Sequence, residues 1–156
     1  MEVQDGLEKQ QPPFSWHESG VFYFLGLRQD LMSNITLEVY EEKDLAIFTA
    51  EGSITVQDVC DSIDSYYSGP IMSLILWDAT RLDLAPWQKD DILSAVRKVK
   101  AYSHLRVGGR SALVFPRDLN FGLAKMFQAY SEVDNLQIEV EVFRNIGDAR
   151  HWLGFS

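Results

Sequence analysis

Residues 71–87 read IMSLILWDATRLDLAPW, and this stretch decides the fold. Its first seven residues form a nearly continuous apolar run, which is typical of a strand buried on both faces of a parallel sheet. Asp78 follows directly, where we expect the strand to end, and Pro86 suits the first turn of a new helix. The stretch therefore predicts a strand, a loop and a helix, which is the repeating unit of an α/β domain.

The segments on either side of this stretch fit the same plan. Residues 35–40 and 45–52 are apolar segments joined by the polar turn EEKD, and they predict a β-hairpin. The strands expected after the hairpin are residues 71–77, 111–115 and 138–143. The helices expected between and after them begin near residues 55, 86, 118 and 145. This order predicts an α/β domain with a mixed, largely parallel sheet that is opened by a β-hairpin and has helices packed on it.

Polar residues mark the expected helix starts. Thr55 is followed three residues later by Asp58, which is the spacing of a capping box. Either Asp118 or Asn120 is expected to cap the helix that follows the strand at 111–115, and Asn145 the last helix. These caps set the boundaries of the predicted helices.

The first 33 residues differ from the rest of the chain. Residues 1–13 are polar and end in two prolines, whereas residues 14–24 hold five aromatic side chains. Disordered tails are poor in aromatic residues, so we expect this segment to bury its rings as an extra strand or a short helix. The surface it covers is that of its own domain, or one across a dimer or partner interface. We therefore divide the chain into an N-terminal arm, 1–33, and an α/β domain, 34–156.

Composition excludes several classes of function. The 156-residue chain has a formal net charge of −9, which disfavours unspecific binding to nucleic acid or anionic membranes. Its one cysteine, Cys60, allows no intrachain disulfide, which fits a reducing cytoplasm. The acidic, polar start lacks the parts of a signal peptide, and the longest early apolar run has seven residues, against about 20 for a spanning helix. We expect a cytoplasmic protein with no nucleic-acid partner and no membrane span.

The familiar catalytic and cofactor motifs are missing. The segment VGGRS lacks the spacing of a phosphate-binding loop, and GRSAL lacks the second glycine of a nucleophile elbow. His17, His104 and His151 are far apart in different predicted elements, and none forms a metal-ligand pair with Cys60. We therefore expect no catalytic residue, no metal site and no cofactor, and we predict that the protein is not an enzyme.

One cluster of charge stands out in this acidic chain. Residues 92–117 contain no Asp or Glu. The five cations that define the predicted basic patch are Arg97, Lys98, Lys100, Arg106 and Arg110. Two interpretations remain open: the cations complement helix dipoles, each worth about 0.3–1 kcal/mol, or they form a docking surface for an acidic partner or an anionic ligand.

Four segments carry a resemblance to a known family: residues 37–59, the stretch LILWDATRLDLAPW, residues 108–130 and residues 139–153. Their layout resembles the SpoIIAA-like proteins of the STAS type, which are bacterial anti-sigma-factor antagonists. It is most similar to an uncharacterised bacterial group placed between those antagonists and the CRAL-TRIO lipid-binding domains. The likeness covers roughly residues 35–154 and leaves the arm outside it.

The resemblance implies a site as well as a fold. In the antagonists an Asp at a strand end is followed by a serine that accepts phosphate from a kinase. Here the Asp falls on Asp78 and the serine on Ala79, so that Thr80 is the nearest hydroxyl and the candidate phosphorylation site. The glycines that usually follow are replaced by Arg81 and Leu82. The likeness thus implies protein binding more than a phosphorylation switch.

We therefore predict a non-catalytic cytoplasmic regulatory or protein-binding module. Its predicted contact surface is the loop from Asp78 to Trp87 and the helix after it, with Thr80, Arg81 and Leu82 presented to a partner. That partner is another protein or a second copy of this chain. In this prediction Asp78 holds the loop through hydrogen bonds from backbone N–H groups. The alternative is a small apolar-ligand or lipid-binding protein resembling CRAL-TRIO domains.

Overall fold

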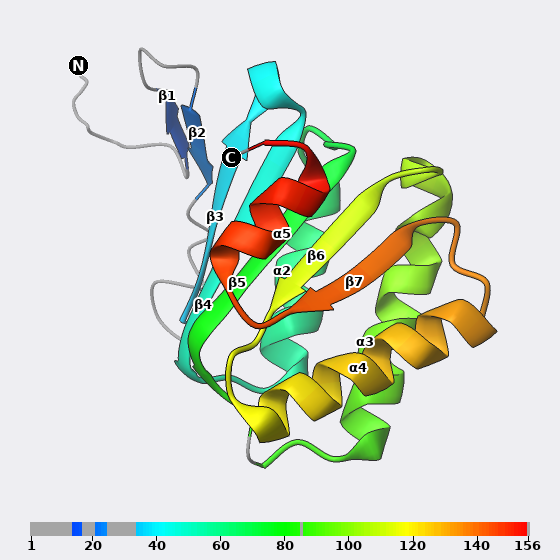
Figure 1. The fold of residues 1–156 in the computed structure, drawn as a ribbon. Helices are drawn as coiled ribbons and strands as arrows, with labels where there is room; N and C mark the ends of the chain where they lie inside the picture. Colours follow the sequence, from blue (N-terminus) through cyan, green and yellow to red (C-terminus); the bar gives the residue numbers. More distant parts are fainter. Residues whose placement is uncertain (1–13, 17–20, 25–33, 85, 156) are drawn as a thin grey trace.

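The computed structural model describes residues 14–16, 21–24, 34–84 and 86–155 (Figure 1). The described strands are β1 (Phe14–Trp16), β2 (Val21–Phe24), β3 (Ile35–Tyr40), β4 (Leu45–Ser53), β5 (Leu74–Asp83), β6 (Arg110–Val114) and β7 (Glu139–Phe143). The described α-helices are α2 (Val56–Tyr67), α3 (Lys89–Ser103), α4 (Asp118–Val133) and α5 (Ile146–Leu153), with short 3₁₀ turns η1 (Glu41–Lys43) and η2 (His104–Arg106).

The strands form one mixed sheet in chain order, from β1 at one edge to β7 at the other. Strands β1 to β4 pair antiparallel, and β4, β5, β6 and β7 pair parallel. The predicted α/β architecture, with a hairpin of β3 and β4 opening a parallel set, is confirmed. The apolar run at residues 71–77 supplies the first four residues of β5, an interior strand as its composition predicted, while residues 71–73 precede the strand.

The strand order explains where the helices lie. Each crossover from β4 to β7 moves one strand in the same direction, and right-handed crossovers therefore place α2, α3 and α4 on one face of the sheet. Helix α5 follows the last strand and covers the opposite face (Figure 1). Buried side chains of both faces form the core, including Phe48 and Ile75 beneath α2 to α4, and Leu76 and Ala112 beneath α5.

The helix starts confirm two expected caps and correct two others. Thr55 and Asp58 form a reciprocal capping box, and Asn145 accepts a hydrogen bond from the backbone N–H at the third position of α5. The expectation that Pro86 lies in the first turn of α3 is wrong, because that helix begins at Lys89. Neither candidate cap of α4 has that role: its cap position makes no side-chain hydrogen bond, and Asn120 is 1% exposed.

Parts of the predicted N-terminal arm belong to the sheet. Strand β2 pairs with β3, and β1 pairs with β2, so the backbone of these two segments extends the sheet beyond the hairpin. The rest of the arm, and its aromatic side chains, lie outside the described residues. Among the residues that are described, no helix combines the length and the apolar character that a membrane crossing requires.

Candidate binding surface at the carboxyl end of β5

Asp78 lies inside strand β5, not at its end. The strand continues to Asp83, so the expected strand end at Asp78 is wrong. Pairing with β6 does stop at Asp78, opposite Val114, and beyond this point β5 pairs with β4 alone. The carboxyl half of β5 therefore projects past its neighbour, at the edge of an α/β sheet where functional segments usually lie.

A β-bulge begins at this point. Thr49 of β4 is opposite Asp78, and the next pair is Glu51 opposite Arg81, so β5 has one residue more than β4 between the two pairs. The Asp78 Oδ1 atom accepts hydrogen bonds from the Thr80 backbone N–H at 3.1 Å and from the Thr80 hydroxyl at 2.8 Å. The carboxylate thus closes a local turn. It gives an acceptor to the Thr80 N–H, a backbone donor that the bulge removes from the regular hydrogen bonds between strands.

Arg81 is the side chain that this bulge directs into solvent. Its side chain is 72% exposed and forms an ion pair with Glu51 of β4, whose side chain is 48% exposed. An exposed pair of this kind contributes about 0–1 kcal/mol. Both charges are therefore free to exchange partners at little cost.

Leu82 is buried, which corrects the expectation that it is presented to a partner. Leu82 and Leu84 belong to the core beneath α2 to α4. The bulge explains the difference. Before it, odd-numbered side chains such as Ile75 and Ala79 face this core; after the extra residue, the even-numbered side chain of Leu82 does so. Of the predicted loop, Thr80 is half-buried and Arg81 is exposed.

Asn120 of α4 hydrogen-bonds the side of β5 that is left without β6 as a neighbour. Its Nδ2 donates to the Leu82 carbonyl at 2.8 Å, and its Oδ1 accepts from the Leu84 N–H at 3.1 Å. These are the two hydrogen bonds that one residue of a parallel neighbouring strand makes. The side-chain amide thus takes the place that β6 leaves empty, across 36 and 38 residues of sequence. Sequence reasoning missed this role, because only the fold brings α4 to β5.

Trp87 fixes the far end of the same segment. Its indole Nε1 donates to the Ile54 carbonyl at 2.8 Å, and its half-buried ring packs against the core. The sequence predicted Trp87 as the last residue of the contact loop, and these contacts tie the segment before α3 to the segment before α2. We call the exposed area around Thr80, Arg81 and Glu51, held between Asp78 and Trp87, the β5 surface.

The underside of the β5 surface is the wall of an apolar cavity. The cavity has a volume of about 90 Å³ and lies between the sheet and helices α2, α3 and α4. All of its described lining residues are apolar, and Leu82, Leu84 and Trp87 are among them. A second cavity of about 40 Å³ shares Trp77 with the first and reaches Arg106. A cavity lined only by apolar groups stays dry and can accept a small apolar molecule.

The predicted basic patch does not form as one surface. Arg106 is 5% exposed, and its guanidinium donates to the carbonyls of Met72, Ser73 and Arg110 and to the Ser111 hydroxyl. Arg106 is therefore a structural link between the starts of β5 and β6, and its place in the patch is wrong.

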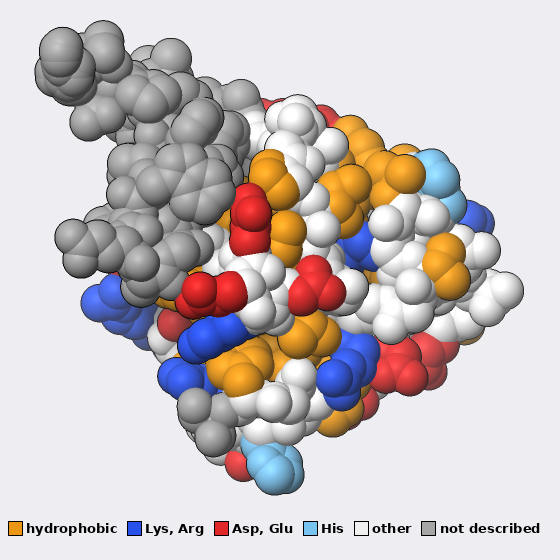
Figure 2. Space-filling view, turned by 90° about the horizontal axis from the view of Figure 1, so that it is seen from above, with side chains coloured by type: hydrophobic (Ala, Val, Ile, Leu, Met, Phe, Trp, Pro, Cys, Tyr) orange, Lys and Arg blue, Asp and Glu red, His pale blue; other side chains and the backbone are white. Residues whose placement is uncertain are grey.

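Arg110 likewise has a structural role. It donates to the carbonyls of Trp152 and Leu153 at the end of α5, at 2.6 and 3.1 Å, and its guanidinium lies 5.4 Å from the Trp152 ring centre. A cation there complements the helix dipole, which is the first of the two interpretations left open for the patch. In Figure 2, which looks down on the molecule from above Figure 1, Lys and Arg side chains are separated by acidic and hydrophobic ones.

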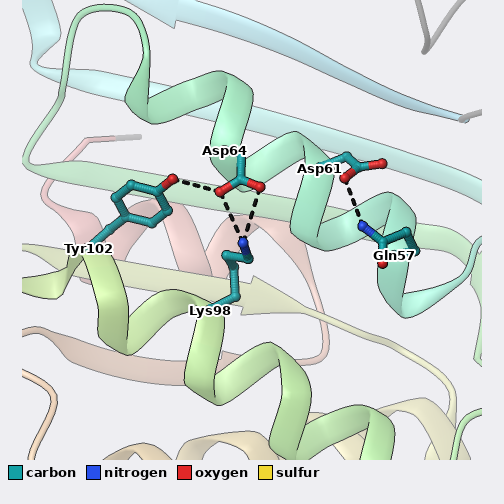
Figure 3. A network of polar contacts seen from close by, with 5 residues as sticks. All are labelled: Gln57, Asp61, Asp64, Lys98 and Tyr102. Carbon is teal, nitrogen blue, oxygen red and sulfur yellow. Dashed lines mark hydrogen bonds and ion pairs between the residues drawn. The ribbon is translucent and has the colours of Figure 1, made fainter.

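Lys98, a third member of the patch, belongs to a polar cluster between α2 and α3 (Figure 3). Its ammonium group donates to both carboxylate oxygens of Asp64 at 3.1 Å, and Tyr102 donates to the same carboxylate at 2.6 Å. The Tyr102 ring also stacks on Tyr67 with 4.4 Å between ring centres. The hydrogen bond to Asp64 raises the pKa of Lys98 and that of Tyr102. This cluster joins two helices, while Arg97 and Lys100 remain exposed.

The described part of the chain contains no group of three or more His, Cys, Asp or Glu residues able to hold a metal ion. Burial raises the pKa of the half-buried Cys60 thiol, which favours its unreactive form. Asp78 accepts hydrogen bonds from the backbone N–H and the hydroxyl of Thr80, so its geometry is that of a backbone-holding carboxylate.

No protein-family model matches the chain, and no curated protein matches it.

Proposed function

We propose that this protein is a non-catalytic cytoplasmic regulatory module of the SpoIIAA-like STAS type, which binds another protein through the β5 surface. The observation that carries the proposal is the bulge at Asp78, which directs Arg81 outward. The strand segment that holds Arg81 is paired with β4 on one side and bonded to Asn120 on the other. The STAS resemblance of the same stretch supports the choice of this surface.

The β5 surface is well suited to binding because it is ordered before a partner arrives. Asp78, Asn120 and Trp87 each hydrogen-bond the backbone near it. A surface held in this way loses little conformational entropy in a complex, and this raises affinity without further contacts. Arg81 and Glu51 then supply one charge of each sign, which favours a partner that offers a carboxylate beside a cation.

Phosphorylation of Thr80 is left out of the proposal. The Thr80 hydroxyl donates to Asp78 at 2.8 Å, and a phosphate there would replace this hydrogen bond with repulsion between anions. The binding function therefore rests on the unmodified surface.

The experiment compares two charge reversals. Wild-type protein, Arg81→Glu and Arg97→Glu are each used to isolate partners, which are identified by mass spectrometry and tested again as purified pairs. We expect a partner that binds wild type and Arg97→Glu and is lost with Arg81→Glu. Sedimentation velocity covers the case in which the partner is a second copy. Equal binding by both variants contradicts the proposal.

A second candidate function rests on the apolar cavity. We propose, as the alternative, that the protein holds a small apolar ligand between the sheet and α2 to α4, as the likeness to CRAL-TRIO domains implies. Its volume of about 90 Å³ fits a ligand of few heavy atoms. Native mass spectrometry and nuclear magnetic resonance under xenon test it. Xenon-dependent shifts at the Ala124 methyl, lost when Ala95→Leu fills the cavity, support it. Their absence at every lining methyl of the wild-type protein refutes it.

A further inference from the structure

Strand β7 is an open edge of the described sheet. It pairs with β6 on one side, and no described strand lies on the other. The Glu139 N–H donates to Gly109 and the Phe143 carbonyl accepts from Phe115, so the odd-numbered residues of β7 direct their backbone groups toward β6. Since these directions alternate along a strand, the N–H and C=O groups of Val140 and Val142 point to the open edge.

A groove runs along this edge. It has a volume of about 490 Å³ and is lined by residues of α4, of β7 and of the segment between them, and by Trp152 of α5. It therefore extends from one face of the sheet around the edge to the other. Val140, whose backbone groups point to the open edge, is one of its lining residues.

The charge of the groove has one sign. Its lining includes Glu132, Glu139 and Glu141, and no Lys, Arg or His is among the described lining residues. Val140 and Val142 are buried beneath α2 to α4, so the side chains of Glu139 and Glu141 leave the strand on its α5 face. The Glu141 carboxylate reaches around the open edge to Gln128 of α4. An added strand would therefore meet two carboxylates on one of its faces.

From these observations we propose that the β7 edge binds an extended basic segment of another protein, which adds to the sheet as a further strand. Main-chain hydrogen bonds to Val140 and Val142 supply affinity, and side chains at alternate positions supply specificity. Lys or Arg at every second position of the segment faces Glu139 and Glu141. The intervening side chains face the polar residues of α4, among them Ser131 and Asn135.

The same charges argue against a second copy of this chain as the occupant. Two β7 edges placed together would bring their glutamates near one another, and like charges across a strand pair are destabilising. Charged residues on edge strands commonly prevent this kind of self-association. In the free protein, Gln128 of α4 donates to Glu141 at 3.3 Å, and this long hydrogen bond is the one the incoming segment displaces.

This site is distinct from the β5 surface, so its test does not depend on the proposed function. The probe is a nonapeptide of alternating Lys and Thr, because Thr favours extended backbone. Its affinity is measured by isothermal titration, and amide hydrogen exchange reports the contact. We expect protection of the Val140 and Val142 amides on binding, and an unchanged affinity for Arg81→Glu.

Two controls separate strand addition from simple attraction between charges. N-methylation of alternate peptide amides removes the donors of one edge only, so one of the two methylation patterns abolishes binding and the other preserves it. The double variant Glu139→Lys, Glu141→Lys should weaken peptide binding about tenfold, which is the size expected when two exposed ion pairs with the peptide lysines are lost and replaced by repulsion. Glu41→Lys with Glu42→Lys changes the net charge equally on exposed residues far along the sheet, and leaves the affinity near that of wild type.

Three results overturn the proposal. Equal binding of both methylated peptides shows unspecific attraction. Equal loss of affinity in the two charge-reversal pairs shows that net charge, and not the groove, attracts the peptide. A dimer that itself protects Val140 and Val142 in sedimentation and exchange experiments shows that a second copy occupies the edge.

Discussion

Replacing Asn120 with Ala tests how the β5 surface is held. The substitution removes the two hydrogen bonds that stand in for a neighbouring strand, at 2.8 and 3.1 Å, and leaves the Leu82 carbonyl and the Leu84 N–H without partners. Both leucines are buried, at 3% and 4% exposure. Each unsatisfied buried group costs about 1–3 kcal/mol, and water entering the vacated space offsets part of this. We expect the free energy of unfolding to fall by about 2–4 kcal/mol.

Urea denaturation followed by circular dichroism measures this loss. Asn145→Ala is the matched control, because it also removes two hydrogen bonds of an asparagine, both to Asp148, but these are exposed, and about 1 kcal/mol is expected for the loss of such a cap. Asn120→Asp refines the test: it keeps an acceptor for Leu84 but loses the donor to Leu82 when ionised, so its deficit should shrink as the pH falls and the carboxyl is protonated. A loss below about 0.5 kcal/mol for Asn120→Ala, with an unchanged denaturant slope, would refute the reasoning.

Three further predictions concern stability. Asp78→Ala removes both hydrogen bonds to Thr80 and should lower the free energy of unfolding by about 0.5–2 kcal/mol in urea denaturation, by analogy with lost helix caps. Asp78→Asn keeps an acceptor and should lower it less. Equal stability of Asp78→Ala and wild type would contradict this. Burial raises the pKa of Tyr66 to about 12. Its neutral form therefore stabilises the fold fully below its unfolded pKa near 10, and this contribution, up to about 3 kcal/mol, is lost as the pH rises from about 10 to 12. Tyr66→Phe should lack that alkaline loss in pH-dependent unfolding, although it also loses two hydrogen bonds to Met72; the same alkaline slope in both proteins would argue against it. Asp64→Asn should lower the melting temperature more than Asp61→Asn. Asp64 joins α2 to α3 through Lys98 and Tyr102, whereas Asp61 accepts a hydrogen bond from Gln57 of its own helix (Figure 3). The reverse order in calorimetry would show that the polar cluster does not hold the helices.

The fold could be predicted because its signals are local. The apolar run at 71–77, the hairpin, the helical spacing and the Thr55–Asp58 capping box each involve residues close in sequence, and each appears in the structure. The limit of β5 was missed for a physical reason. A bulge shifts the buried positions from Ala79 to Leu82, which breaks the two-residue alternation that identifies a strand.

The candidate site was harder to predict because its contacts are long-range. The residue type of Asn120 makes it, like Asp118, a candidate helix cap, and only the packing of α4 against the sheet gives it Leu82 and Leu84 as partners. Arg106 was placed on a basic surface because its neighbours in sequence are basic. Its actual partners include carbonyls of Met72 and Ser73, more than 30 residues away, which no local pattern reveals.

Hydrogen exchange in a complex with a purified partner tests the central claim most directly. The account predicts that the partner slows exchange at the backbone amides of residues 80–83 in β5 and of Glu51 and Gly52 in β4, and that Arg81→Glu removes this protection. Protection confined to any other part of the chain, with residues 80–83 exchanging as in the free protein, would contradict binding through the β5 surface.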